Sequence, residues 1–204
     1  MVAAPSIPEV ASPPGEQRML LHGVGWKEYV ILRELLDQPG LHLTYREGTL
    51  ELMSPSPEHE IWKTNIARLV ELYAHIRRID LYGYGSTTFK REAKARGAEP
   101  DECYLVGKQL QDVPQIALEV IHASPLLDKL DVYAGLGVAE VWIFKEGAFS
   151  LHALDSSAGT YAPISRSRFL PDLDFDLVAR FAMRIDTPQA LREFEQAVIA
   201  EHSH

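Results

Sequence analysis

Two carboxylates in the middle of the chain are the residues whose types and spacing best suit chemistry. Glu119 lies in PQIALEVIHASP, residues 114–125, where the predicted strand is apolar on both faces apart from this one charge. Asp101 follows Pro100 at the start of the preceding strand-like run, DECYLVG. An uncompensated buried carboxylate costs several kcal/mol, so Glu119 requires either an ion pair with an Arg or Lys of an adjacent element or a bound metal ion.

The two acids together are more informative than either alone. If their strands are neighbours in a sheet, Asp101 and Glu119 lie close together. A hard cation such as Mg²⁺, or Mn²⁺ in its place, is bound by oxygen atoms and usually takes only one or two protein carboxylates, with water and substrate phosphate in the other positions. The pair therefore favours a divalent-metal site, whereas EPD, residues 99–101, is by itself typical of an ordinary turn.

The composition excludes several classes of protein. The chain has 204 residues, 46% of them hydrophobic, which predicts one domain with a sizeable core. No run of about 18 apolar residues is present to span a bilayer, and the start, MVAAPSIPEVASPPGEQ, lacks the features of a secretion signal. We therefore expect a cytoplasmic protein with no membrane partner. The single cysteine, Cys103, excludes an internal disulfide framework, and the formal net charge of −9 requires any phosphate-binding face to be local.

Hydrophobic spacing predicts helices and strands that alternate along the chain. Helices are expected over residues 25–36, from the N-cap Ser56 to about Ile79, and over residues 126–137 and 188–201. Strands are expected over residues 41–45, 49–53, 86–93, 101–107, 115–121, 138–144, 148–154 and 160–164. The first two form a hairpin, the next three are neighbours in one sheet, and residues 115–144 form a strand–helix–strand crossover. The fold class is α/β, with a mixed central β-sheet flanked by helices.

The chain divides into a short arm and one domain. Residues 1–20 are rich in proline and have little periodic hydrophobicity, so we expect a flexible N-terminal arm. Residues 21–204 then form a single domain.

Several motifs resemble the Uma-two family of restriction-type endonucleases, whose members look like compact PD-(D/E)XK nuclease domains. The motifs are REGTLELMSPSPEH, the Pro100-Asp101 pair, PQIALEV, Lys129 in DKLDVY, and YAGLGVAEVWIF, and they cover most of residues 41 to 145. Their order and spacing carry the resemblance. It implies a restriction-endonuclease-like fold.

The resemblance also implies a mechanism and a site. Asp101, Glu119 and the backbone carbonyl of Val120 would hold Mg²⁺ or Mn²⁺, and the metal would activate a water molecule for hydrolysis of DNA. Lys129 would orient that water, although an ordinary surface lysine is the alternative interpretation. His59 would contact phosphate or a water near the metal, and its alternative is a polar residue at a helix start. Tyr133 and Trp142 also match the family, and we assign them to core packing.

The chain departs from the family pattern at several positions. Thr44 stands where the family usually has a glutamate, four residues before the hairpin glycine. The sequence does not establish which face of the hairpin the nearby Glu47 and Glu51 occupy. Ile121 stands where the usual pattern has its lysine, so Lys129, on the following helix, must serve instead.

The sequence therefore leaves more than one function open. DNA contacts would come from FKREAKARG, with Lys90, Arg91, Lys94 and Arg96, unless this charge run is a solvated turn. The main hypothesis is a metal-dependent endonuclease. The alternative is a catalytically inactive relative that acts as a nucleic-acid-binding or homo-oligomeric assembly module, and a homodimer is a mild expectation in either case. A carboxylate-pair glycosidase is disfavoured because exposed aromatic residues that would bind sugar are not evident.

Overall fold

The fold is described from a computed structural model, which covers residues 15–38, 40–107, 112–122, 125 and 127–201. Five α-helices occur within these residues: α1 (Trp26–Leu35), α2 (Pro57–Ile76), α3 (Lys129–Leu136), α4 (Phe175–Ala182) and α5 (Thr187–Glu201). The strands are β1 (Gln17–His22), β2 (His42–Arg46), β3 (Thr49–Ser54), β4 (Leu81–Gly83), β5 (Phe89–Arg91), β6 (Arg96–Ala98), β7 (Glu102–Val106), β8 (Ile116–Ile121), β9 (Glu140–Lys145), β10 (Ala148–Asp155) and β11 (Thr160–Ile164).

The strands form two sheets. The first has the order β1-β3-β2-β6-β5 and is antiparallel throughout. The second has the order β11-β10-β9-β8-β7-β4, and within it β8 and β9 run parallel. Parallel neighbours need a crossover connection, and α3 supplies it, as the sequence predicted. The mixed α/β class is confirmed and is consistent with a restriction-endonuclease-like fold.

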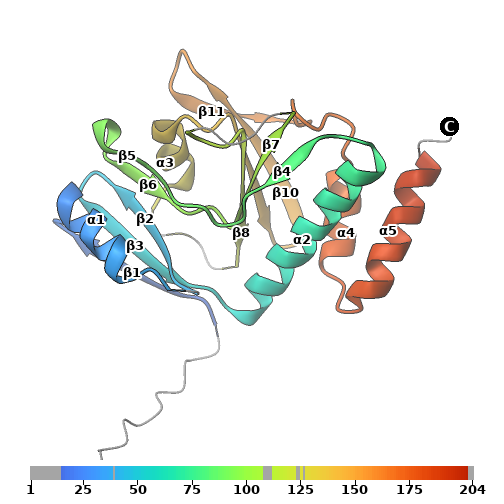
Figure 1. Ribbon diagram of the computed structural model, residues 1–204, viewed down its shortest axis with the longest axis horizontal. Coiled ribbons are helices and arrows are strands. Elements are labelled where there is room, and N and C mark those ends of the chain that lie inside the picture. The colour runs from blue at the N-terminus through green and yellow to red at the C-terminus, as the bar shows by residue number, and fades with distance from the viewer. Residues whose placement is uncertain (1–14, 39, 108–111, 123–124, 126, 202–204) are drawn as a thin grey trace, which may run out of the picture.

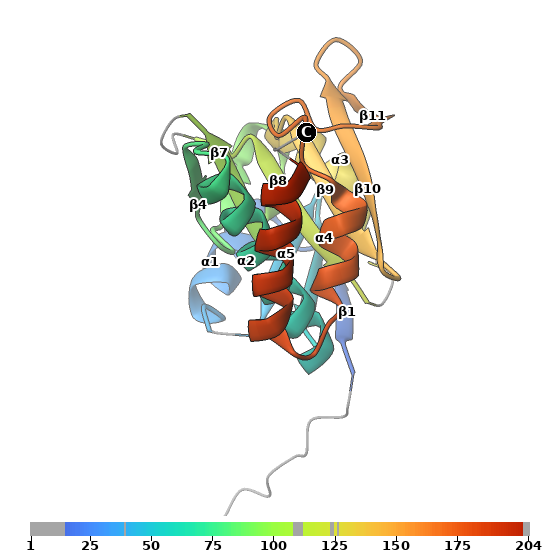
Figure 2. The same ribbon diagram turned by 90° about the vertical axis from the view of Figure 1, so that its right-hand side faces the viewer.

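The helices cover the sheets in layers (Figure 1). Helix α1 packs on the outer face of the first sheet, where Tyr29 meets buried residues of β2 and β3. Helices α2, α4 and α5 form one layer on the second sheet, and Figure 2 shows α5 in front with α4 and α2 beside it. Helix α3 lies between the two sheets, because its buried side chains contact β5 and β6 on one side and β8 and β9 on the other. The junction of the two sheets is therefore an interior region.

Local sequence signals fix the two helices that matter for the site. Helix α2 begins at Pro57 after Ser56, whose hydroxyl accepts a hydrogen bond from the backbone N–H of His59 at 3.2 Å. Helix α3 is capped by the Asp128 side chain and ends at Gly137, which has a φ of 89°. Such a positive φ is comfortable only for glycine. These caps hold His59 in the first turn of α2 and start α3 at Lys129.

The structure differs from the sequence prediction in several features. Residues 86–93 were expected beside β7 and β8, but β5 joins the first sheet, because its partner is β6. Of the expected arm, residues 1–14 lie outside the described residues, whereas Gln17–His22 form β1, which pairs with β3. Helix α4 was not predicted. It carries a strong apolar face that packs on α2 and β10.

A helix that crosses a bilayer must be long and almost entirely apolar. Within the described part of the chain, none is both long enough and apolar enough to span a bilayer.

Candidate active site

The two carboxylates singled out in the sequence lie opposite each other at the junction of the sheets. Strands β7 and β8 are antiparallel and pair Glu102 with Leu118. Asp101 directly precedes the first paired residue of β7, and its charge acts on Glu119, the residue after Leu118 on β8. The backbone N–H of Asp101 donates to the carbonyl of Leu118 at 3.1 Å, which anchors this end of the pair. Asp101 is 1% exposed and Glu119 is 3% exposed, so both acids are removed from solvent.

Lys129 reaches Glu119 even though it comes from a helix instead of the strand. Its ammonium lies 3.3 Å from Oε1 of Glu119 and 3.0 Å from the hydroxyl of Thr44, and the residue is 5% exposed. The hydroxyl of Tyr133, one turn later on α3, donates to the same Oε1 of Glu119. The ion pair considered for Glu119 in the sequence is therefore present, and the lysine expected to act in catalysis is the one that forms it.

His59 connects Asp101 to the N-terminal part of the chain. Its Nε2 lies 3.0 Å from Oδ1 of Asp101, and its Nδ1 lies 3.0 Å from Oε2 of Glu16. The other oxygen of Asp101, Oδ2, accepts from the backbone N–H of Val120 at 2.7 Å. The imidazole side chain is 0% exposed. His59 thus lies between two carboxylates.

The chain of charges continues through Arg18 to Glu51. Arg18 Nε lies 2.7 Å from Oε1 of Glu16, and its Nη1 donates to Oε1 of Glu51. Oε2 of Glu51 accepts from the backbone N–H of Leu127 at 2.8 Å. Glu51 is 1% exposed and stands directly across the ladder from Thr44, so its carboxylate lies on the face of the first sheet that meets α3.

These neighbours set the protonation of the site. Burial alone would raise the pKa of Asp101, but the hydrogen bond and charge of His59 hold that pKa below its usual value. Burial raises the pKa of Glu119, against the opposing effect of Lys129. Burial would lower the pKa of His59, but its hydrogen bonds to Asp101 and Glu16 raise the pKa to about 9.

The site holds more acidic than basic groups. The contacts described above join four carboxylates with three basic side chains, and the members are Glu16, Glu51, Asp101, Glu119, Arg18, His59 and Lys129. A cation bound beside Asp101 and Glu119 would offset the excess negative charge, and carboxylate oxygens suit Mg²⁺ and Mn²⁺. Within the described residues, however, no three or more His, Cys, Asp or Glu side chains converge on a single metal position. A metal ion beside this pair would therefore take its remaining ligands from backbone carbonyls and water.

Some functional candidates were not found by sequence reasoning. Glu16 and Arg18 fell in the expected arm, and Tyr133 was assigned to the core, where it is buried but also bonds Glu119. Trp142 is a core residue as expected. His42 is 7% exposed and lies on the same face of β2 as Thr44, and in the described part of the chain its Nδ1 contacts no hydrogen-bond partner. Burial lowers the pKa of His42, which keeps it neutral.

The basic segment FKREAKARG forms the hairpin of β5 and β6 at one edge of the first sheet. Lys90, Arg91 and Lys94 are exposed there. Arg96 is 8% exposed and forms ion pairs with Glu47 and Asp131. Its charge is therefore already matched inside the protein.

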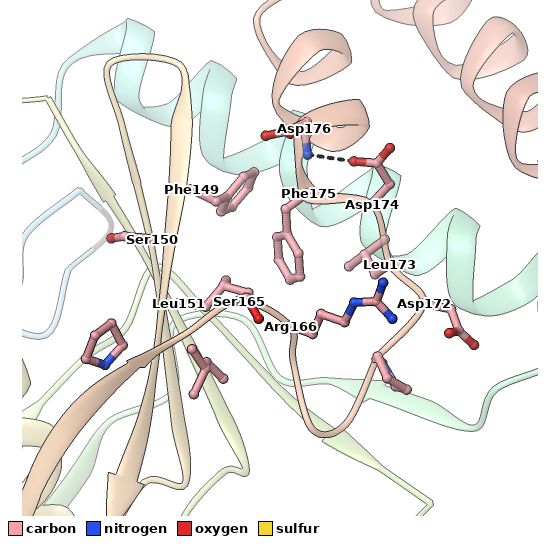
Figure 3. A pocket seen from close by; sticks show the side chains of 13 residues that line it. Phe149, Ser150, Leu151, Ser165, Arg166, Asp172, Leu173, Asp174, Phe175 and Asp176 are labelled. Atoms are coloured by element: carbon pink, nitrogen blue, oxygen red, sulfur yellow. Dashed lines mark hydrogen bonds between the residues drawn. The ribbon is translucent and has the colours of Figure 1, made fainter.

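A hollow on the surface lies away from these acids. This cavity of about 660 Å³ lies between β10, β11 and the segment that leads into α4. Figure 3 shows Phe149 and Phe175 on its wall and Arg166 near Asp172. None of the buried charged residues described above lines it. The candidate active site is closed by its own side chains.

We expect the stability of the protein to fall between about pH 6.5 and 9 because of His59. Its pKa of about 9 in the folded protein exceeds the ordinary value of 6.5, so its contribution is complete below pH 6.5 and is lost as the pH rises through 9. The shift corresponds to about 3 kcal/mol. Urea unfolding at pH 6 and pH 9.5 measures the loss in the wild type and in His59→Gln, which should lack it.

The control for this pH dependence is His75→Gln, which removes an exposed histidine from the other end of the same helix. It should keep the profile of the wild type. Parallel profiles for the wild type and His59→Gln would contradict the assignment of a charged His59.

The chain matches the model of a known protein family. A family model described as "Putative restriction endonuclease", Uma2, matches residues 26–185, more than half of the 204 residues. The matched range includes every residue of the candidate site from His42 to Tyr133 and excludes Glu16 and Arg18. No match was found among the curated proteins.

Proposed function

The chain belongs to the Uma2 family, and from that premise we propose that it is a divalent-metal-dependent endonuclease that hydrolyses phosphodiester bonds of DNA. The observation that carries the proposal is the buried Asp101–Glu119 pair with Lys129 beside it. Two acids and a lysine at a sheet junction suit hydrolysis by an activated water molecule and need no covalent protein intermediate.

Each residue has a role in this reaction. Asp101, Glu119 and the carbonyl of Val120 would hold the Mg²⁺ or Mn²⁺ ion. When bound, the ion would lower the pKa of a water molecule that it holds, and its positive charge would stabilise the negative charge that develops on the phosphate. Lys129, already within hydrogen-bond distance of Glu119 and Thr44, orients the attacking water, and His59 contacts the phosphate. The oxygen of water bonds to phosphorus, one P–O ester bond breaks, and the alcohol that leaves takes up a proton.

DNA is the proposed substrate, and the exposed basic side chains of the β5–β6 hairpin are its proposed contacts away from the reacting phosphate. Lys90, Arg91 and Lys94 project from an edge of the first sheet. Contacts from such side chains go to phosphates and fix the position of the duplex without reading its sequence. Because these contacts are few, they should give weak binding that falls with added salt only with a shallow slope.

Nicking of supercoiled plasmid tests the function. The wild type should nick at low salt with Mg²⁺ or Mn²⁺ and stop when EDTA is added, and Asp101→Asn and Glu119→Gln should both be inactive. The matched control is Glu102→Gln, next to Asp101 but on the opposite face of the strand. Burial raises the pKa of Glu102 to about 7, so at pH 8 this control removes the same charge and should nick normally. Equal nicking by all variants would identify a contaminant.

A second candidate is a catalytically inactive relative that binds nucleic acid or assembles with itself. It is favoured by the internal pairing of the site, since both oxygens of Asp101 already have partners in His59 and Val120. Wild-type protein that binds plasmid but does not nick it in either metal would support this candidate.

A further inference from the structure

The candidate active site is shut in the structure, and a segment of the chain covers one side of it. His59, Asp101, Glu119 and Lys129 are all at most 5% exposed. A phosphate group can reach them only if a covering group moves. On the side of His59 that faces away from Asp101, Glu16 is in direct contact with the imidazole, and its own side chain is also 0% exposed.

The carboxylate of Glu16 makes the contacts that a bound anionic ligand would make. Its two oxygens are held separately, Oε2 at 3.0 Å from Nδ1 of His59 and Oε1 at 2.7 Å from Nε of Arg18. Carboxylate oxygens only accept hydrogen bonds, so both ring nitrogens of His59, which face Glu16 and Asp101, must donate. One donor, Arg18, lies on β1, and the other, His59, lies on α2. Each donates to a different oxygen of the same carboxylate. Two oxygens of a phosphate group could accept the same two hydrogen bonds.

The donors do not depend on Glu16 for their positions. His59 is held from the other side by Asp101, and its backbone is fixed at the capped start of α2. Arg18 is held by Glu51 and lies within the β1 ladder, where it pairs with Met53. If Glu16 leaves, both donors stay where they are and face the vacated position.

Glu16 can leave without unpairing the sheet. The β1–β3 ladder begins at Gln17, which pairs with Ser54, so Glu16 precedes the first paired residue of an edge strand. Gly15, next to it, has a φ of 138° and its Cβ position meets no atom within 4 Å. Moving Glu16 outward therefore breaks at least its ion pairs with His59 and Arg18, and it leaves the β1–β3 pairing of Gln17–His22 in place.

We propose that His59 and Arg18 form a phosphate-binding subsite and that Glu16 occupies it as an internal substitute for the phosphate group. The inference rests on the proposed function for the identity of the ligand, and it adds that Glu16 controls access to the subsite. Binding of a nucleic-acid phosphate displaces the carboxylate from both donors. Neither metal nor bond cleavage is needed for this exchange.

Titration with inorganic phosphate, at constant ionic strength and without metal, tests the subsite. Calorimetry measures the affinity of every variant, and the ring ¹⁵N signals of His59, assigned by their loss in His59→Gln, show where the phosphate binds. Glu16→Gln keeps the size of the side chain but removes its charge, and it should bind phosphate at least about tenfold more tightly than the wild type, because an internal occupant raises the apparent Kd. Adding His59→Gln to Glu16→Gln should abolish the gain.

Two further variants separate this effect from general charge and from misfolding. Glu58→Gln removes an exposed carboxylate from the first turn of the same helix, and its phosphate affinity should stay close to that of the wild type. Glu16→Asp keeps the charge but is too short to reach both donors, so it should also bind phosphate more tightly than the wild type. This variant decides the matter if Glu16→Gln fails to fold.

A second ligand identifies the source of the phosphate. A short single-stranded oligothymidylate should displace inorganic phosphate from Glu16→Gln if the subsite takes phosphodiesters, and failure to displace it would mean that the subsite takes terminal or free phosphate. Affinities of folded Glu16→Gln and Glu16→Asp equal to those of the wild type and Glu58→Gln would overturn the subsite. Tight phosphate binding without plasmid nicking would instead contradict the nuclease function and leave the subsite intact.

Discussion

Replacing Lys129 by methionine is expected to destabilise the protein and to abolish nicking. The ammonium is buried against Glu119 and Thr44, and removing one partner of a buried ion pair typically costs about 3–5 kcal/mol. Glu119 would then keep the hydroxyl of Tyr133 as its partner, and burial already raises its pKa. Protonation of Glu119 relieves the penalty, so the loss of stability should be smaller at pH 5 than at pH 8. Urea unfolding at both pH values measures this difference.

The activity of Lys129→Met should fall at least about 100-fold, because the attacking water loses the group that orients it. Lys145→Met is the matched control, because the Lys145 side chain is 46% exposed and pairs with Glu146 at the surface. Its stability should change by less than about 1 kcal/mol. A folded Lys129→Met protein that nicks at the wild-type rate would exclude Lys129 from the proposed mechanism.

Replacing Arg18 by methionine is expected to have the largest effect on stability of any single change in β1. Its guanidinium pairs with both Glu16 and Glu51, whose side chains are 0% and 1% exposed. Without Arg18, two buried carboxylates lose their shared cation, and a loss of about 3–5 kcal/mol follows. Arg18 helps to hold the pKa of Glu16 below its usual value. Without Arg18 that pKa should rise, so the deficit should grow as the pH rises.

Unfolding of Arg18→Met at pH 5 and pH 8 measures the deficit. Arg192→Met provides the control, because Arg192 is exposed on α5 and bonds Gln189 within the same helix. Arginine and methionine have similar helix propensity, so this control should be nearly neutral. If Arg18→Met is as stable as the control at both pH values, β1 contributes no buried ion pair to the domain.

Much of the fold follows from local sequence signals. The β2–β3 hairpin, the cap of α2 at Ser56, and the crossover from β8 through α3 to β9 are confirmed, because apolar periodicity and turn residues act over a few positions. The assignment of β5 to the first sheet could not be obtained in this way. It depends on pairing with β6, and a short strand with exposed charges carries no sign of its partner.

The site residues likewise fall into those that local sequence signals indicate and those that depend on contacts between distant segments. The buried position of Glu119 was visible as one charge in an apolar strand, and its alignment with Asp101 follows from strand order. Lys129 reaches Glu119 because α3 lies between the sheets, which spacing alone does not reveal. Glu16 and Arg18 were missed because a proline-rich start gives little periodicity. Their contacts with His59 and Glu51 join residues that are at least 33 positions apart in the sequence.

Binding of Mn²⁺ is the most direct test of the Asp101–Glu119 pair as the metal site of a nuclease. Calorimetric titration of the wild type should show one site, weakened at least about tenfold in Asp101→Asn and Glu119→Gln and unchanged in Glu102→Gln. Wild-type protein that binds no Mn²⁺, or variants that bind it equally well, would contradict the metal site and leave the two acids as partners in internal ion pairs.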